Sequence, residues 1–158
     1  MREADISDEM IRTATINDLE FLARHDHHIS REVMQGKIAD SQVYVVTEGE
    51  DIVGWLRYGL LWDCVPFMNM LYVLEPYRRK GLGRQLVERW ERDMRARGFK
   101  LVLTSTQADE EAQHFYRQLG YIDSGALLLP GEPAEIILRK HVGASEQESG
   151  ASGEPVTG

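Results

Sequence analysis

The sequence has little of several features, and each shortage excludes a class of protein. Cys64 is the only cysteine among the 158 residues, so no disulfide can form within the chain and a reducing compartment is expected. No apolar run approaches the roughly 20 residues that a membrane-spanning helix needs. The charged N-terminus also lacks the apolar core of a signal peptide. We therefore expect a cytoplasmic protein with no membrane partner.

Positive charge is scarce overall, because the net charge is −8. Nucleic-acid binding requires a basic face, so no nucleic-acid partner is predicted. The positive charge that is present gathers in one segment, residues 78–100, which has nine Lys and Arg against three acidic residues. Such a local excess indicates either a bound anion or a solvated helix face.

Periodic patterns predict one α/β domain over residues 1–142, followed by a disordered Gly/Ser/Glu tail over 143–158. Four helices are expected. Thr15, Ser30 and Asp109 are predicted to cap the start of three of them, and the fourth is expected to begin after Gly83. Gly98 and Gly120 are predicted to end the last two. Strands are expected over residues 11–14, 42–47, 52–62, 65–74, 101–106, 121–129 and 134–139. The short connections over residues 42–74 favour an antiparallel meander.

The stretch over residues 66–100 combines an apolar strand, a basic loop with two glycines and a long amphipathic helix. A helix N-terminus has unpaired N–H groups and the positive end of the helix dipole, so it can bind an anion. Gly81 and Gly83 leave room for an anion against the backbone, and the added charge comes from Arg78, Arg79, Lys80 and Arg84. The same pattern also fits a plain strand-to-helix turn. It is neither a P-loop nor a dinucleotide fingerprint.

Two motifs resemble those of the GNAT superfamily of N-acetyltransferases. The run Arg78-Arg79-Lys80-Gly81-Leu82-Gly83 matches the family signature Gln/Arg-x-x-Gly-x-Gly/Ala. About thirty residues later, the run from Ala112 to Tyr121 is similar to the family block Ala-x-x-Phe-Tyr-x-x-x-Gly-Phe/Tyr. The resemblance covers residues 11–141 and implies the α/β (α+β) GNAT fold. In that fold a mixed, mostly antiparallel, splayed sheet of six or seven strands is flanked by about four helices.

The resemblance further implies acetyl-CoA as co-substrate. The pantetheine arm is then expected in the gap between residues 68–73 and 101–106. Backbone groups of Leu71, Tyr72 and Val73 would pair with its amides, and the N–H near Leu71 would polarise the thioester carbonyl. The pyrophosphate would be held by the loop residues Arg78, Arg79, Lys80, Gly81, Leu82, Gly83 and Arg84.

Tyr116 has two interpretations. From the residues alone it is a core aromatic beside Phe115 on an amphipathic helix. The resemblance implies that it contacts the cofactor and acts as the general acid, because a thiol pKa of about 8.5 means that protonation assists departure of the thiolate. One position departs from the family, which often has Asn where this chain has Asp109. Asp109 can cap a helix, but it lacks an amide N–H₂ for the cofactor.

The general base is left open. Many family members place a carboxylate on the strand before the loop, where this chain has Phe67 and Asn69. The candidates are Asp63, the cluster His25-Asp26-His27-His28 with its carboxylate Asp26, and a chain of water molecules. Asp26 belongs to the run His25-Asp26-His27-His28, which could be a metal site, part of the acceptor site or a solvated helix end. Since no second ligand group accompanies it, we predict no metal.

The resulting hypothesis is direct transfer of an acetyl group from acetyl-CoA to a primary amine in a ternary complex. The acceptor is a small molecule or a protein, and an acidic chain attracts cationic amines without selecting among them. The alternatives are a non-catalytic acyl-CoA-binding or sensing module on the same fold, and a domain that binds another nucleotide. Whether the chain forms a homodimer is left open.

Overall fold

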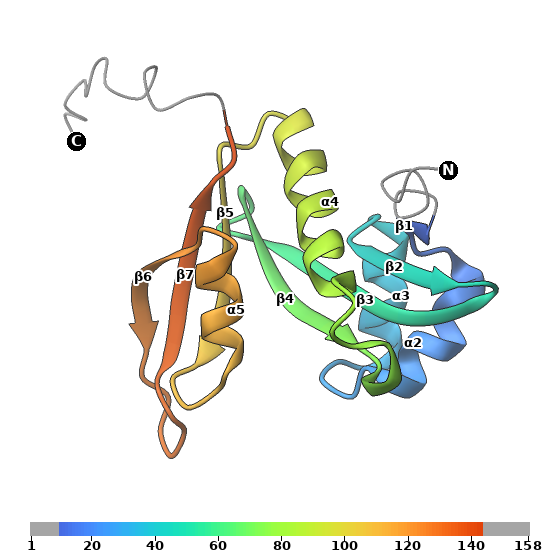
Figure 1. Ribbon diagram of the computed structural model, residues 1–158, viewed down its shortest axis with the longest axis horizontal. Coiled ribbons are helices and arrows are strands. Elements are labelled where there is room, and N and C mark those ends of the chain that lie inside the picture. The colour runs from blue at the N-terminus through green and yellow to red at the C-terminus, as the bar shows by residue number, and fades with distance from the viewer. Residues whose placement is uncertain (1–9, 144–158) are drawn as a thin grey trace.

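Seven strands form one sheet in the order β1-β2-β3-β4-β5-β7-β6 in the computed structural model, which describes residues 10–143 (Figure 1). The strands are β1 (Ile11–Thr13), β2 (Val43–Glu48), β3 (Asp51–Leu61), β4 (Val65–Val73), β5 (Leu101–Gln107), β6 (Ile122–Leu127) and β7 (Glu135–His141). Within the described residues the helices are α2 (Leu19–His25), α3 (Arg31–Ala39), α4 (Leu82–Ala96) and α5 (Ala112–Gln118), with short 3-10 turns η1 (Ile16–Asp18) and η2 (Glu75–Tyr77). The predicted fold class is confirmed.

All strand pairs but one are antiparallel, and β2, β3 and β4 form the predicted meander. The exception is β4 with β5, a parallel pair that is held together only at Phe67 with Leu103 and Met68 with Thr104. Beyond these two pairs the strands separate, and the sheet divides into a β1–β4 half and a β5–β7–β6 half (Figure 1). The splayed sheet that the resemblance implied is therefore present.

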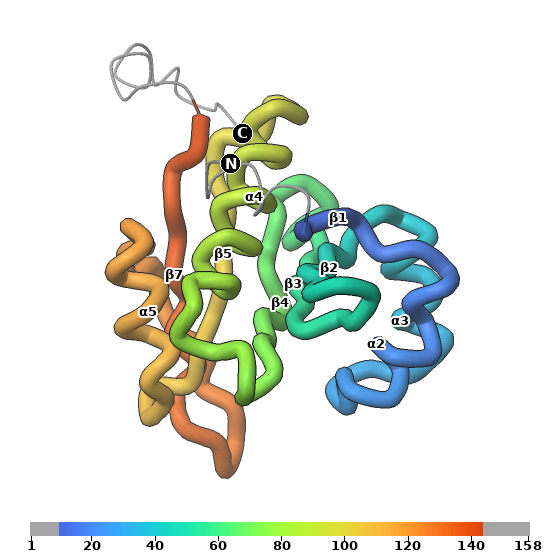
Figure 2. The backbone as a smooth tube through the Cα atoms, turned by 45° about the vertical axis from the view of Figure 1, so that its right-hand side comes forward, coloured from blue at the N-terminus to red at the C-terminus, as the bar shows by residue number. Residues whose placement is uncertain are grey.

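Alternation along the strands gives the sheet one core on each face. Tyr44 and Val46 on β2 belong to the cluster that includes Trp90 of α4, whereas Val43 and Val45 belong to the cluster that includes Leu22 of α2. Successive side chains of a strand point to opposite faces, so a run of apolar residues supplies both cores. Helices α2 and α3 cover one face beside the β1–β4 half, and α5 lies beside β5 and β7 (Figure 2).

Most helix ends lie where the sequence signals place them. The Asp18 carboxylate accepts a hydrogen bond from the Thr15 backbone N–H at 2.7 Å, which closes the capping box before η1 and α2. The Ser30 hydroxyl accepts from the Val33 N–H at 3.2 Å and caps α3. Gly120, with φ of +97°, follows α5 and ends it in the left-handed conformation that favours glycine.

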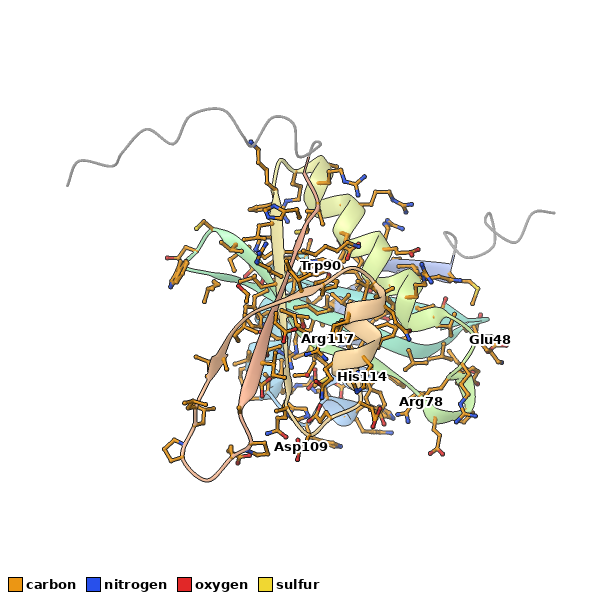
Figure 3. The ribbon with its side chains drawn as sticks, turned by 60° about the vertical axis from the view of Figure 1, so that its left-hand side comes forward. Glu48, Arg78, Trp90, Asp109, His114 and Arg117 are labelled. Carbon is orange, nitrogen blue, oxygen red and sulfur yellow. The ribbon has the colours of Figure 1, made fainter. Side chains whose placement is uncertain are left out.

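The prediction that Asp109 caps α5 is wrong. The helix begins at Ala112 with Glu111 as its N-cap, and Asp109 lies in the preceding loop (Figure 3). That loop forms a turn closed by the Glu110 N–H, which donates to the Gln107 carbonyl at 3.0 Å. The Gln113 side chain then folds back and donates to the carbonyls of Ala108 and Glu110, both at 2.9 Å. These bonds satisfy loop carbonyls in a turn, so the chain enters the helix two residues later than predicted.

The tail predicted over residues 143–158 lies outside the described residues, apart from Gly143. In the described range, no helix has both the length and the apolar character needed to cross a membrane. Cys64 is exposed and free in the turn between β3 and β4.

Candidate functional site

A β-bulge marks the point at which β4 leaves β5. Arg57 of β3 pairs with Met70 and Tyr58 pairs with Met68, so Asn69 between them has no partner on β3. A bulge bends its strand and increases the local twist. The last residue of β4 paired with β5 is Met68, directly before the bulge. The bulge at Asn69 therefore accounts for the opening between the two strands.

The opening holds a cavity of about 500 Å³, which we call the cleft. Its walls come from β4, β5, the loop before α5, α5 itself, the start of β7 and the segment between α2 and α3. The lining residues are His28, Met68, Asn69, Met70, Leu71, Thr104, Ser105, Thr106, Gln107, Glu110, Ala112, Tyr116 and Glu135. The cleft therefore brings Leu71 and Tyr116, two residues singled out in the sequence, into one cavity.

The basic glycine loop lies at the N-terminus of α4. Gly81 is the N-cap of this 15-residue helix with φ of +80°, and a glycine has no side chain that could cap the first N–H groups. A Cβ added at Gly83 would lie 3.9 Å from Leu71 Cδ2 and 3.9 Å from Val73 Cγ2, so this turn packs directly on β4. Uncapped N–H groups and the helix dipole together favour a bound anion.

The basic side chains of the loop differ in how they are engaged. Arg84 is paired with Glu88 of the same helix at 2.8 Å, and both side chains are exposed. Arg78 lies over the Tyr72 ring and donates from Nε to the Val73 carbonyl at 2.8 Å. Lys80 lies over the Tyr77 ring. Within residues 10–143, Arg78, Arg79 and Lys80 have no carboxylate within 4.0 Å. Their charge is therefore available to an anion.

Beyond the bulge, Leu71, Tyr72 and Val73 pair with β3 on one side and have no strand partner on the side of β5. In an antiparallel pair, alternate residues direct their backbone groups away from the partner strand. Half of the backbone groups of this segment can therefore pair with a ligand. One of them, the Val73 carbonyl, already accepts from Arg78.

Tyr116 is buried, with 6% of its surface exposed, and it lines the cleft. Burial raises the pKa of Tyr116 to about 12, while a hydrogen bond with Thr104 acts in the opposite direction and the charge of Glu110 adds to the increase. The Thr104 hydroxyl itself donates to the Met68 carbonyl at 3.1 Å. The phenol is therefore protonated throughout the physiological pH range, which is the state that a proton donor needs.

The two carboxylates named as candidate bases lie in different places, and neither lines the cleft. Asp63 is exposed in the turn before β4, on the closed side of the paired residues Phe67 and Leu103. Asp26 is 2% exposed and pairs with the buried Arg57, whose Nε lies 2.9 Å from its Oδ2. Its other oxygen accepts from the His28 backbone N–H at 3.2 Å.

The run from His25 to His28 lines a second cavity of about 290 Å³, which we call the aromatic cavity. Its lining residues are His25, Asp26, His27, His28, Trp55, Met70, Tyr72 and Leu74. No group of three or more His, Cys, Asp or Glu in the described part of the chain has the geometry to hold a metal ion.

Sequence reasoning missed two carboxylates of the cleft, Glu110 and Glu135. Glu135 is the first residue of β7 and accepts a hydrogen bond from the Ser105 hydroxyl at 2.8 Å. This contact depends on the pairing of β5 with β7, thirty residues apart in the chain, so no local pattern could have indicated it. Glu110 lies in the turn that was taken for the first turn of α5.

The fold has many relatives among solved structures. An acetyltransferase of the GNAT family from Bacillus cereus has 23% sequence identity and a TM-score of 0.68, and the match covers 83% of this chain and 95% of that one. The ribosomal-protein-S18-alanine N-acetyltransferase from Escherichia coli has 18% identity and a TM-score of 0.69, with 85% and 94% covered. The PaiA N-acetyltransferase from Thermoplasma acidophilum, solved with coenzyme A, has 18% identity and a TM-score of 0.69, with 83% and 97% covered.

No curated protein sequence matches the chain. The sequence model of the acetyltransferase (GNAT) family, in contrast, matches residues 10–121. This range contains the glycine loop and also β4, β5 and α5, and these two strands and the helix supply most of the residues that line the cleft. The match spans more than half of the 158 residues. The chain therefore belongs to the acetyltransferase (GNAT) family.

Proposed function

We propose that the protein transfers an acetyl group from acetyl-CoA to a primary amine, by direct attack in a ternary complex. The observation that carries this proposal is the cleft between β4 and β5, which is lined by Leu71 and Tyr116 and lies on the strand against which the glycine loop packs. Family membership supports acyl transfer in general. The choice of acetyl group, the direct mechanism and the roles of the residues below are proposals.

The donor site is proposed along β4 and the start of α4. Three cations without carboxylate partners and the uncapped N-terminus of α4 favour the pyrophosphate, with Arg79 as the main contact among the loop residues. The free side of residues 71–73 suits the amides of the pantetheine arm, and the Leu71 N–H is the proposed donor to the thioester carbonyl. In support, the PaiA neighbour was solved with coenzyme A.

Tyr116 is the proposed proton donor to the departing thiolate. A thiol has a pKa of about 8.5, whereas burial raises the pKa of Tyr116 to about 12. Lasting transfer from the phenol to the thiolate is therefore unfavourable, unless the phenolate regains a proton. The attacking amine provides one, because its nitrogen must lose a proton when the amide forms. Tyr116 is thus a relay between amine and thiolate rather than a final proton source.

The acceptor is proposed to be a primary amine, carried by a small molecule or by a protein. Several neighbours of the fold act on proteins or bind peptides by their names, including the E. coli ribosomal-protein-S18-alanine N-acetyltransferase and a NatC complex bound to Gag peptide. These names concern those proteins, at 18% and 15% identity. They support amines as the acceptor class for this chain.

Release of coenzyme A during incubation with acetyl-CoA and a library of amines tests the proposal. We expect thiol release that depends on the amine, with an acetylated product of the corresponding mass. Binding of acetyl-CoA without release by any amine would contradict catalysis and favour the non-catalytic acyl-CoA-binding module. A matched control is heat-inactivated protein, which accounts for spontaneous thioester aminolysis.

A further inference from the structure

The cleft and the aromatic cavity meet. His28 and Met70 line both cavities, and all the other lining residues belong to only one of the two. Met70 is paired with Arg57 directly beside the bulge, one residue before Leu71. A molecule in the aromatic cavity can therefore reach the part of the cleft where β4 leaves β5.

Beyond the bulge, the side chains of β4 that lie beside the two cavities are on opposite faces of the strand. Leu71 and Val73 pack toward Gly83 at the start of α4. The Tyr72 ring, in contrast, packs against the Trp55 ring with centroids 5.0 Å apart and a tilt of 33°, on the face that α2 and α3 cover. A donor held by the glycine loop and an acceptor held in the aromatic cavity would approach the same point without competing for space.

The walls of the aromatic cavity are mainly apolar and aromatic. Trp55, Met70, Tyr72 and Leu74 form one side, and the run from His25 to His28 forms the other. Its volume of about 290 Å³ is small and suits a group the size of an amino-acid side chain. Such surfaces favour an apolar or aromatic group, and a second charge buried among them is costly unless a counter-charge pairs with it.

The cavity offers no carboxylate to a second cation. Asp26 is its one acidic residue, and its carboxylate is 0% exposed and paired with Arg57. The other ionisable groups that face His28 from this side are His25, His27 and Tyr72. From the cleft, His28 is faced by Glu110, Tyr116 and Glu135. A diamine in the aromatic cavity would therefore leave one ammonium group without a counter-ion.

We propose that the aromatic cavity binds the acceptor, that this acceptor is a primary amine on an apolar or aromatic body without a second positive charge, and that His28 takes the proton which the amine must lose. Two kinds of molecule carry such an amine: a free small amine and a peptide, through the amino group of its first residue. This inference rests on the proposed acyl transfer. It narrows the cationic amines that the net charge of −8 suggested.

The reaction balances with two protons. The acceptor ammonium gives one proton to the imidazole of His28, and the free amine nitrogen forms a bond to the thioester carbonyl carbon. The carbon–sulfur bond then breaks, and the thiolate receives a proton from Tyr116. Tyr116 regains that proton from the nitrogen, which becomes the amide nitrogen. His28 releases its proton to water. Histidine is the side chain that most often serves as a general base in enzymes.

The Asp26–Arg57 pair holds His28 at the junction. Arg57 extends from β3 beside the bulge, and Asp26 joins it to the segment between α2 and α3 through the His28 N–H. Asp26 is thus a positioning residue in this proposal, not the base.

The first test compares two acceptors that differ only in charge, hexylamine and 1,6-diaminohexane, by coenzyme A release. We expect kcat/KM for hexylamine to be about tenfold higher or more, because the second ammonium lacks a partner. Equal or better turnover of the diamine would overturn the cavity assignment while leaving acyl transfer intact. Failure of every amine would instead contradict the proposed function. A comparison of turnover between 2-phenylethylamine and a peptide that begins with Phe then shows whether the acceptor is a free small amine or the first residue of a peptide.

The second test places a carboxylate in the cavity. Leu74 is half-buried and lines it. We expect Leu74→Glu to shift the hexylamine-to-diaminohexane ratio about tenfold toward the diamine relative to Leu74→Gln, which has the same shape without the charge. The ratio is measured within one protein, so lost stability does not affect it. An identical ratio in the two variants would contradict the proposal.

The third test addresses His28. We expect His28→Gln to lower kcat/KM for hexylamine about a hundredfold at pH 7 and to recover part of it near pH 10, where more of the amine is already neutral. KM for acetyl-CoA should stay unchanged. The control is His141→Gln, on an exposed residue at the end of β7. Wild-type activity in His28→Gln at pH 7, or a loss that is the same at every pH, would overturn the role of His28.

Discussion

The two sides of β4 are built by different means. On the side of α4, the site consists of backbone: an uncapped helix N-terminus, two glycines and a strand segment without a partner. On the side of α2 and α3, it consists of side chains from separate elements, joined by a buried ion pair between Asp26 and Arg57. A backbone site suits one ligand that is common to a family, whereas a side-chain site can change with the acceptor.

The difference predicts that ion pairs matter unequally on the two sides. The side chains of Asp26 and Arg57 are 0% and 5% exposed, whereas those of Arg84 and Glu88 on α4 are 64% and 53% exposed. We expect Asp26→Asn to lower the free energy of unfolding by about 3–5 kcal/mol, because Arg57 stays buried without a counter-charge. Glu88→Gln should cost only about 0.3–0.5 kcal/mol. Urea denaturation of both variants measures this, and equal losses would contradict the comparison.

A second prediction concerns the chemistry on the side of α4. We expect Tyr116→Phe to lower kcat about a hundredfold or more while KM for acetyl-CoA changes little, because only the proton donor is lost. Steady-state kinetics with saturating amine measures the effect. If the proton-relay role is correct, the remaining activity should show no new dependence on pH between 6 and 9. Full activity at every pH would exclude Tyr116 as the donor.

Alkaline pH should destabilise the core on the face of α4, where burial raises the pKa of Tyr116, Tyr121 and Tyr44. A tyrosine with a raised pKa stabilises the fold fully below the unfolded value of about 10, and this contribution is lost as pH rises from there toward the folded value. We expect the free energy of unfolding to fall above pH 10, by up to about 1.4 kcal/mol per pH unit for each tyrosine. Tyr44→Phe should reduce this slope, and an unchanged slope would contradict it.

One glycine on each side gives a further pair of small predicted effects. Gly81 before α4 has φ of +80°, so Gly81→Ala should cost about 1–2 kcal/mol in the free energy of unfolding and weaken acetyl-CoA binding. Gly36 lies inside α3 with no atom within 4 Å of an added Cβ. Gly36→Ala should therefore stabilise the protein by about 0.5–1 kcal/mol. Thermal unfolding of both variants checks the opposite signs.

The same contrast explains what the sequence could predict. The strand, Arg79, Gly81, Gly83 and the helix after them are neighbours in the chain, so their pattern was visible and the fold class followed. The role of Asp109 was predicted wrongly because a loop turn and the first turn of a helix use the same residue types. The choice between the two depended on the side chain of Gln113, which bonds to the loop carbonyls. The proposed acceptor side could not be predicted because its contacts are distant in sequence, as with Asp26 and Arg57, thirty-one residues apart.

Acetyl-CoA binding to the wild type and to Arg79→Ala, measured by titration calorimetry, tests the central claim most directly. Arg24→Ala, which removes an equal charge from the exposed surface of α2, is the control. We predict saturable binding by the wild type and Arg24→Ala, about tenfold weaker binding by Arg79→Ala, and a smaller salt dependence in that variant. Absence of binding by the wild type, or equal affinity in all three proteins, would contradict the assignment of the glycine loop to the pyrophosphate.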